Sequence, residues 1–135
     1  MSSPTKADVR LILVVDDDES VRTFTKLALK HFGFEAIEAE DGPAAIEIVR
    51  AQSAHIGAVI LDLTMPCMDG VETLSALRQV APDVPVILVS GFGTSRLDDV
   101  AGWLAPGTAP EAVLRKPFTP EELLSTLQRV MKPPT

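Results

Sequence analysis

The chain has 135 residues, of which 46% are hydrophobic and 23% charged, and its formal net charge is −7. This length and composition predict one globular domain, and the acidic balance disfavours direct binding of nucleic acid, which needs a basic face. The single cysteine excludes an internal disulfide, and no apolar run reaches the roughly 18 residues of a membrane span.

The first half of the chain alternates short apolar runs with segments of helical spacing. Leu11–Val15 is a continuous run typical of a strand buried on both faces, and the helical pattern after it ends at Gly33. Phe34–Ala39 is a second, weaker strand. A second helix is predicted from Pro43, because proline suits the first helical position. Ala58–Leu61 is the third strand.

The second half repeats this alternation. A third helix opens near Asp69, the fourth strand is Val84–Val89, and a less regular helix is expected around Thr94–Leu104. Ala112–Leu114 is a weaker fifth strand. The last helix is predicted from Thr119, with the glutamate three residues later as its capping-box partner. Strand and helix thus alternate five times, which predicts an α/β fold: a doubly wound parallel sheet of five strands with five helices on its two faces.

Polar side chains stand where the predicted strands end. Asp16 and Asp17 follow the first strand, and the later strands are followed by Asp62, Ser90 and Lys116. Ligands bind such sheets beyond the carboxyl ends of the strands, so we expect these residues to converge. The three carboxylates would repel one another, and a divalent cation together with the lysine would balance their charge. Carboxylate and phosphoryl oxygens are ligands that Mg²⁺ prefers, so the pattern predicts a magnesium site that receives a phosphoryl group.

The same residues carry a family resemblance. The acidic cluster in "VVDDDES", the segment "LDLTMPCMDG", the pair Ser90-Gly91 and the tripeptide "KPF", in this order, resemble the receiver domain of two-component response regulators. The resemblance covers the chain from about Val9 to Met131, and it implies a flavodoxin-like sheet with strand order 2-1-3-4-5. The implied layout is a disordered N-terminal tail at 1–8, the receiver domain at 9–131 and a C-terminal tail at 132–135.

The resemblance implies a role for each acidic residue of the site. Asp62 matches the phosphoacceptor, a carboxylate nucleophile that forms an acyl phosphate. Asp16 and Asp17 match the acidic pair that holds Mg²⁺, or Mn²⁺ as an alternative, with Asp17 preferred as the direct ligand. Asp62 itself and the backbone carbonyl of Thr64 would complete the metal site.

The remaining site residues would contact the phosphoryl group. Lys116 would pair with its oxygens as a point charge, the hydroxyl of Ser90 would sense it through a hydrogen bond, and Pro117 resembles the family's cis-proline. The donor would be a sensor histidine kinase or a histidine phosphotransfer protein. The domain would catalyse only its own phosphorylation and dephosphorylation, so we do not expect an enzyme. With no output domain of its own, it would signal in the cytoplasm by binding a downstream protein target, without direct contact with nucleic acid or membrane.

Three features depart from the usual family pattern. Cys67 stands where the family often has glycine, and "AGWLAPGTAPEAVLRKPF" looks more like receivers fused to hybrid sensor kinases. Val113 stands where tyrosine or phenylalanine is usual. Because valine is short and stiff at χ1, it cannot swing between buried and exposed positions as a ring does. We therefore expect phosphorylation to reorder the segment Gly91–Trp103 instead.

Two other classes of function fit parts of the sequence. A phosphatase of the haloacid-dehalogenase type also places Asp-x-Asp after its first strand, and Ser90 and Lys116 could serve as its downstream residues. It needs a further acidic pair, and only Glu121 and Glu122 follow the lysine. Turnover of p-nitrophenyl phosphate would distinguish this class. A docking module that never accepts phosphate would be suggested by the loss of a site residue, and all five are present.

Overall fold

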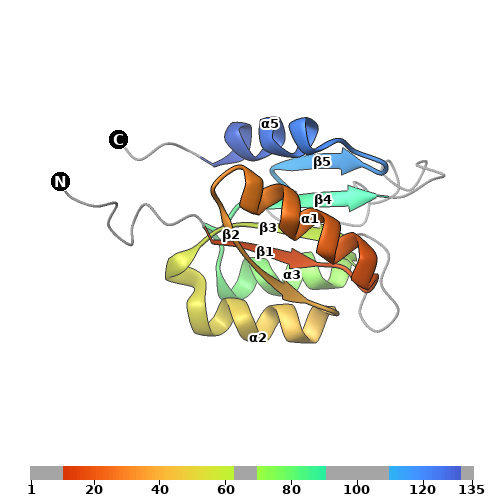
Figure 1. Ribbon diagram of the computed structural model, residues 1–135. Helices are drawn as coiled ribbons and strands as arrows, with labels where there is room; N and C mark the ends of the chain where they lie inside the picture. Colours follow the sequence, from red (N-terminus) through yellow and green to blue (C-terminus); the bar gives the residue numbers. More distant parts are fainter. Residues whose placement is uncertain (1–10, 63–69, 91–109, 132–135) are drawn as a thin grey trace.

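The computed structural model describes residues 11–62, 70–90 and 110–131, which form an alternating series of strands and helices (Figure 1). No helix within these ranges has the length and apolarity to cross a membrane. The elements in chain order are β1 (Leu11–Val15), α1 (Glu19–His31), β2 (Glu35–Ala39), α2 (Gly42–Gln52), the short 3₁₀ helix η2 (Ser53–His55), β3 (Ile56–Asp62), α3 (Gly70–Val80), β4 (Val86–Ser90), β5 (Ala112–Arg115) and α5 (Pro120–Val130).

The five strands form one parallel sheet in the order β2-β1-β3-β4-β5. The α/β class, the doubly wound sheet and the strand order are therefore confirmed. The fourth expected helix, at Thr94–Leu104, lies outside the described residues. Three strands end one residue later than predicted. β5 ends at Arg115, and two strands end in candidate site residues, β3 in Asp62 and β4 in Ser90. Both polar residues thus belong to the sheet itself, where their main chains are fixed by the ladder.

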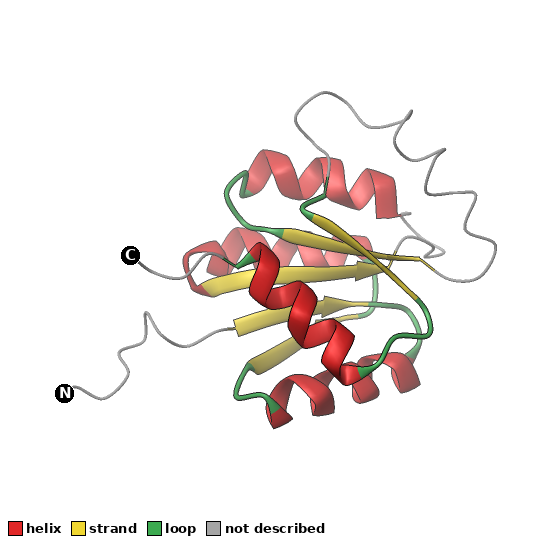
Figure 2. Cartoon of the chain, turned by 90° about the horizontal axis from the view of Figure 1, so that it is seen from above, coloured by secondary structure: helices red, strands yellow, loops and turns green. Residues whose placement is uncertain are grey.

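Helices cover the sheet on both faces, with α1 and α5 on one side and α2 and α3 on the other (Figures 1 and 2). Successive side chains of a strand point to opposite faces. In β1, Ile12 and Val14 pack with α1 and α5, while Leu13 and Val15 pack with α2 and α3, and all four are fully buried. Burial on both faces explains why the strands read as continuous apolar runs in the sequence.

Side-chain caps fix where three helices begin. Asp18 caps α1 by accepting a hydrogen bond from the N–H of Ser20 at 2.8 Å, and Asp41 caps α2. At α5, Thr119 and Glu122 form the predicted capping box, with reciprocal bonds of 3.0 and 2.8 Å. The first N–H groups of a helix have no partner within the helix, and a side chain that accepts a hydrogen bond from one of them stabilises the start of that helix. Asp18 is therefore separate in role from the two aspartates before it.

The register of the ladder brings four strand ends to one edge of the sheet. Val15 pairs with the residue that precedes Asp62, and Ser90 pairs with the residue that precedes Lys116. The peptide bond between Lys116 and Pro117 is cis, as the resemblance implied. The residues predicted to form the site therefore leave the sheet side by side.

Candidate functional site

Three carboxylates meet at the carboxyl edge of the sheet. Asp16 follows β1, Asp17 is the next residue in the turn toward α1, and Asp62 ends β3. One carboxylate oxygen from each lies within 4.8 Å of the others. Asp16 and Asp62 are buried, whereas Asp17 is exposed. The predicted convergence is confirmed, and the exposed Asp17 is the member open to a cation that arrives from solvent.

Lys116 brings positive charge into this cluster from the segment after β5. Its Nζ lies 3.1 Å from Oδ2 of Asp16 and 3.8 Å from Oδ2 of Asp62. The lysine side chain is 24% exposed and the two carboxylates are 5% and 4% exposed, so both ion pairs are largely sheltered from water. Charges interact more strongly there than at the surface. One lysine offsets one of three negative charges, which leaves the cluster net negative.

Ser90 places a buried hydroxyl at the same edge. It is 2% exposed, and its carbonyl accepts a hydrogen bond from the N–H of Lys116 at 2.8 Å. Its Oγ finds no hydrogen-bond partner in the described part of the chain. A buried polar atom without a partner costs roughly 1–3 kcal/mol. A ligand oxygen that accepted this hydrogen bond would remove that cost.

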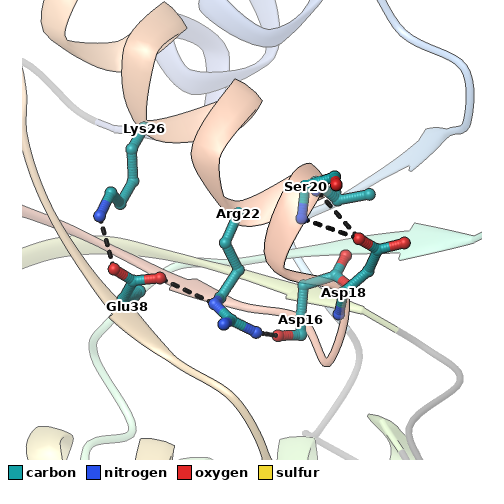
Figure 3. Close-up of polar contacts among 7 residues, drawn as sticks. Asp16, Asp18, Ser20, Arg22, Lys26 and Glu38 are labelled. Atoms are coloured by element: carbon teal, nitrogen blue, oxygen red, sulfur yellow. Dashed lines mark hydrogen bonds and ion pairs between the residues drawn. The ribbon is translucent and has the colours of Figure 1, made fainter.

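Every polar group of Asp16 is engaged. Its N–H donates to the carbonyl of Ala39 at 3.2 Å, and its own carbonyl accepts from Nη1 of Arg22 at 2.7 Å (Figure 3). Its Oδ1 accepts from the N–H of Asp18 at 2.9 Å, and its Oδ2 accepts from Lys116. The turn that follows β1 therefore starts from a residue held at both its main chain and its side chain.

Glu38 of β2 binds two basic side chains of α1. Its Oε1 accepts from Nε of Arg22 at 2.7 Å, and its Oε2 accepts from Nζ of Lys26 (Figure 3). Two hydrogen bonds hold the pKa of Glu38 below its ordinary value, and the bond from Lys26 has a larger effect than the bond from Arg22. The hydrogen bond to Glu38 in turn raises the pKa of Arg22.

Neither Arg22 nor Glu38 was predicted as part of the site. The available signal was the spacing of Arg22 and Lys26, because like charges four residues apart on a helix repel unless an acid lies near both. That acid stands on a different element, sixteen and twelve positions away. The pairing of β1 with β2 is what brings it there.

Acid should weaken the fold partly through Glu38. A carboxyl whose pKa is lowered on folding stabilises the protein above its ordinary pKa of 4.5, and this contribution is lost as the pH falls through the folded value. We expect the unfolding midpoint in urea of Glu38→Gln to fall less than that of wild type below pH 4.5. The difference should be modest, because Glu38 is 39% exposed and solvent screens it. Glu35→Gln, which removes an exposed acid from the same strand, is the matched comparison. An unchanged dependence in Glu38→Gln would contradict this expectation.

Some predicted features lie outside the described residues. These are the Thr64 carbonyl, Cys67 and the segment Gly91–Trp103, and what was expected of them stays a prediction. Val113 is described, and it is 40% exposed on β5.

The donor set at this edge fits a small, hard cation. All three grouped ligands are carboxylates, and neither histidine nor cysteine is among them. Mg²⁺ takes oxygen ligands, commonly one or two carboxylates together with waters, whereas structural zinc sites are built from sulfur and nitrogen ligands. The cluster therefore could hold a divalent metal ion.

Comparison with known proteins identifies the family. Residues 12–128 match the family model described as the response regulator receiver domain. The sensor kinase CckA of Brucella abortus (strain 2308) is 32% identical over 121 residues, which cover 90% of this chain and 12% of CckA. The transcriptional regulatory protein PrrA of Mycobacterium tuberculosis (strain ATCC 25618 / H37Rv) is 36% identical over 121 residues, which cover 90% of this chain and 49% of PrrA. The chain therefore spans half or less of the length of these two relatives.

Solved structures agree over nearly the whole chain. The chemotaxis protein CheY4 of Vibrio cholerae is 33% identical with a TM-score of 0.77, and the match covers 90% of this chain and 98% of CheY4. A response regulator receiver domain protein from Clostridium thermocellum has a TM-score of 0.81 at 25% identity, with 91% and 94% of the two chains covered. Sequence, fold and the acidic edge of the sheet lead to one conclusion: this chain belongs to the response regulator receiver family and is a receiver domain of a two-component signal transduction system.

Proposed function

We propose that Asp62 accepts a phosphoryl group from a phosphohistidine in a Mg²⁺-dependent reaction, and that the phosphorylated domain then binds a downstream protein target. The observation that carries this proposal is the meeting of three carboxylates, a lysine and a buried serine hydroxyl at one edge of the sheet. A structural role for this arrangement is hard to justify, because clustered acids and an unpartnered hydroxyl both cost stability.

In the proposed transfer, a carboxylate oxygen of Asp62 attacks the phosphorus atom. An O–P bond forms and the P–N bond to the donor imidazole breaks, so the imidazole leaves with the bonding electron pair and takes a proton from solvent. Lys116 lies 3.8 Å from the Asp62 carboxylate, where it can offset the charge of the phosphoryl oxygens. The Ser90 hydroxyl would donate a hydrogen bond to one of these oxygens. A bound Mg²⁺ would supply further neutralisation of the same charge.

The metal would be held by residues at the ends of β1 and β3. Asp17 is the preferred direct ligand because it is exposed, while the buried Asp16 and Asp62 supply further carboxylate oxygens. The backbone carbonyl of Thr64 is the last proposed ligand. The same all-oxygen set would accept Mn²⁺.

The proposed partners follow from membership of the receiver family. The donor is a sensor histidine kinase or a histidine phosphotransfer protein, and the setting is the cytoplasm. The domain takes part in its own phosphorylation and dephosphorylation and turns over no other substrate. Signalling then depends on a conformational change that a protein target recognises.

The phosphatase alternative lacks its second acidic pair. Glu122 accepts a hydrogen bond from the N–H of Thr119 and so belongs to the capping box of α5. We therefore expect no turnover of p-nitrophenyl phosphate above the buffer rate, with or without Mg²⁺. Sustained turnover that depends on Asp16 would favour the phosphatase instead.

Millimolar Mg²⁺ should raise the melting temperature of the domain. Repulsion among the three carboxylates is relieved when a cation binds the folded form, so binding adds to stability. Asp17→Asn should melt at a higher temperature than wild type without metal, because one repelling charge is gone. It should also lose most of the rise that Mg²⁺ produces. Both effects can be measured by calorimetry or circular dichroism in metal-free buffer with and without Mg²⁺.

Asp18→Asn is the matched control for this experiment. It removes the neighbouring charge, and asparagine caps helices about as well as aspartate. It should therefore keep most of the wild-type response to Mg²⁺. Equal responses in wild type and Asp17→Asn would count against the proposed metal site.

A further inference from the structure

The guanidinium of Arg22 links the acidic edge of the sheet to β2. Its Nη1 donates to the main-chain carbonyl of Asp16 and its Nε donates to Glu38, both at 2.7 Å, and Figure 3 shows the guanidinium between the two. The side chain is only 12% exposed. Because a guanidinium is planar and rigid, the bond to Glu38 also fixes the direction of the bond to Asp16.

The Asp16 main chain is consequently anchored to β2 at two points. Its N–H donates directly to the carbonyl of Ala39, and its carbonyl is held through Arg22 by Glu38, the residue next to Ala39. On the other side of the turn, Asp18 caps α1 and donates its N–H to Oδ1 of Asp16. Asp17 lies between these two held residues, and it is exposed to solvent.

We infer that Arg22 is a positioning residue for the cation, because it fixes the turn that presents Asp17. This inference rests on the proposed metal site. Arg22 would touch neither the metal nor the phosphoryl group, and it would act only through the main chain of Asp16. Residues that orient metal ligands in this way commonly change metal affinity by about 10–100-fold when they are replaced.

If Arg22 acted on Mg²⁺ binding only through its charge, its replacement by a neutral residue would have the opposite effect. A cation beside three carboxylates weakens the binding of a second cation, so removal of the Arg22 charge should tighten Mg²⁺ binding. Loss of positioning should weaken it. Lys26 allows the effect of charge to be measured without that of positioning. It binds the same Glu38, and no interaction found among the described residues joins it to Asp16.

The test is titration of MgCl₂ into the metal-free domain, followed by calorimetry at a temperature where every variant is folded. Arg22→Gln should raise the dissociation constant for Mg²⁺ about tenfold or more. Arg22→Lys keeps the charge but lacks the planar fork, so its dissociation constant should lie closer to that of Arg22→Gln than to that of wild type. Lys26→Gln removes a charge from the same network and should bind Mg²⁺ as tightly as wild type or slightly more tightly.

Two results would overturn the inference, and they can be told apart. If wild type binds Mg²⁺ and Arg22→Gln binds it equally or more tightly, positioning by Arg22 is rejected while the proposed function stands. If wild type binds no Mg²⁺, the proposed metal site fails and the inference fails with it. A purely structural role would lower the melting temperature without changing the affinity of the folded domain. If Arg22→Gln does not fold, Arg22→Lys decides the question, because charge alone predicts a wild-type dissociation constant for it.

Discussion

Replacement of Asp62 by asparagine is expected to abolish phosphorylation of the domain by acetyl phosphate in the presence of Mg²⁺. Asparagine keeps the shape of the side chain, but its neutral amide is not a nucleophile and forms no acyl phosphate. The intact mass of the wild-type domain should rise by one phosphoryl group, and the mass of Asp62→Asn should not change.

Two comparisons make the result specific to the reacting carboxylate. Asp83→Asn changes an exposed aspartate before β4, at the opposite end of that strand from Ser90, and it should be labelled as completely as wild type. Asp62→Asn should melt at least as high as wild type without metal, since it removes a charge from a crowded cluster and leaves Lys116 paired with its nearer partner, Asp16. Unfolding could then not explain the lost label. Stoichiometric labelling of Asp62→Asn would place the phosphorylation site elsewhere.

Lys116→Met is expected to slow phosphorylation about 100-fold or more, the range seen when a preorganised charge or donor is removed from a transition state. It should also destabilise the metal-free domain. Asp16 and Asp62 are buried, and both would lose the ammonium that lies 3.1 and 3.8 Å away. Removal of one partner from a buried ion pair costs about 3–5 kcal/mol. The partial exposure of Lys116 places the expected loss near or below the lower end of that range.

The response of Lys116→Met to Mg²⁺ should be larger than that of wild type. Without the lysine the cluster is more negative, so a bound cation relieves more repulsion. Urea unfolding with and without Mg²⁺ measures both effects, and mass spectrometry over time measures the rate of phosphorylation. Lys30→Met, an exposed change in the last turn of α1, should match wild type in both experiments. Unchanged stability and an unchanged Mg²⁺ response in Lys116→Met would show that this lysine does not offset the charge of the carboxylates.

The sequence was sufficient to predict the sheet because the relevant signals are local. Ile12 to Val15 form an uninterrupted apolar run, which is typical of a strand covered on both faces, and the structure buries this run between two pairs of helices. The spacing of Thr119 and Glu122 likewise predicted the start of α5, because it is the pattern of a capping box. Convergence of the site was predictable as well, because parallel strands end at one edge of their sheet. The strand order, in contrast, came from the family resemblance and not from any spacing in the chain.

What the sequence could not supply depends on contacts between distant residues. Nothing in the local sequence distinguishes the buried Asp16 from the exposed Asp17. Asp16 contacts Lys116, which stands one hundred positions away in the chain. The bond between Arg22 and Glu38 requires β1 to pair with β2, which periodicity alone does not predict. The ends of strands also depend on such pairing. Asp62 and Ser90 follow apolar runs and are polar, so the sequence alone assigns them to loops, whereas pairing with a neighbouring strand makes them the last residues of β3 and β4.

The place of Ser90 within the ladder has a consequence for how it would report phosphorylation. Its carbonyl accepts the N–H of Lys116, and it pairs with Arg115 of β5. A shift of the Ser90 main chain would break hydrogen bonds of the sheet, whereas rotation of its side chain would leave these main-chain hydrogen bonds intact. Rotation about χ1 has three staggered wells, and more than about 90% of side chains occupy one of them. Under the proposed function, the Ser90 hydroxyl would therefore exchange among a few discrete orientations, and a phosphoryl oxygen would favour the one that donates a hydrogen bond to it.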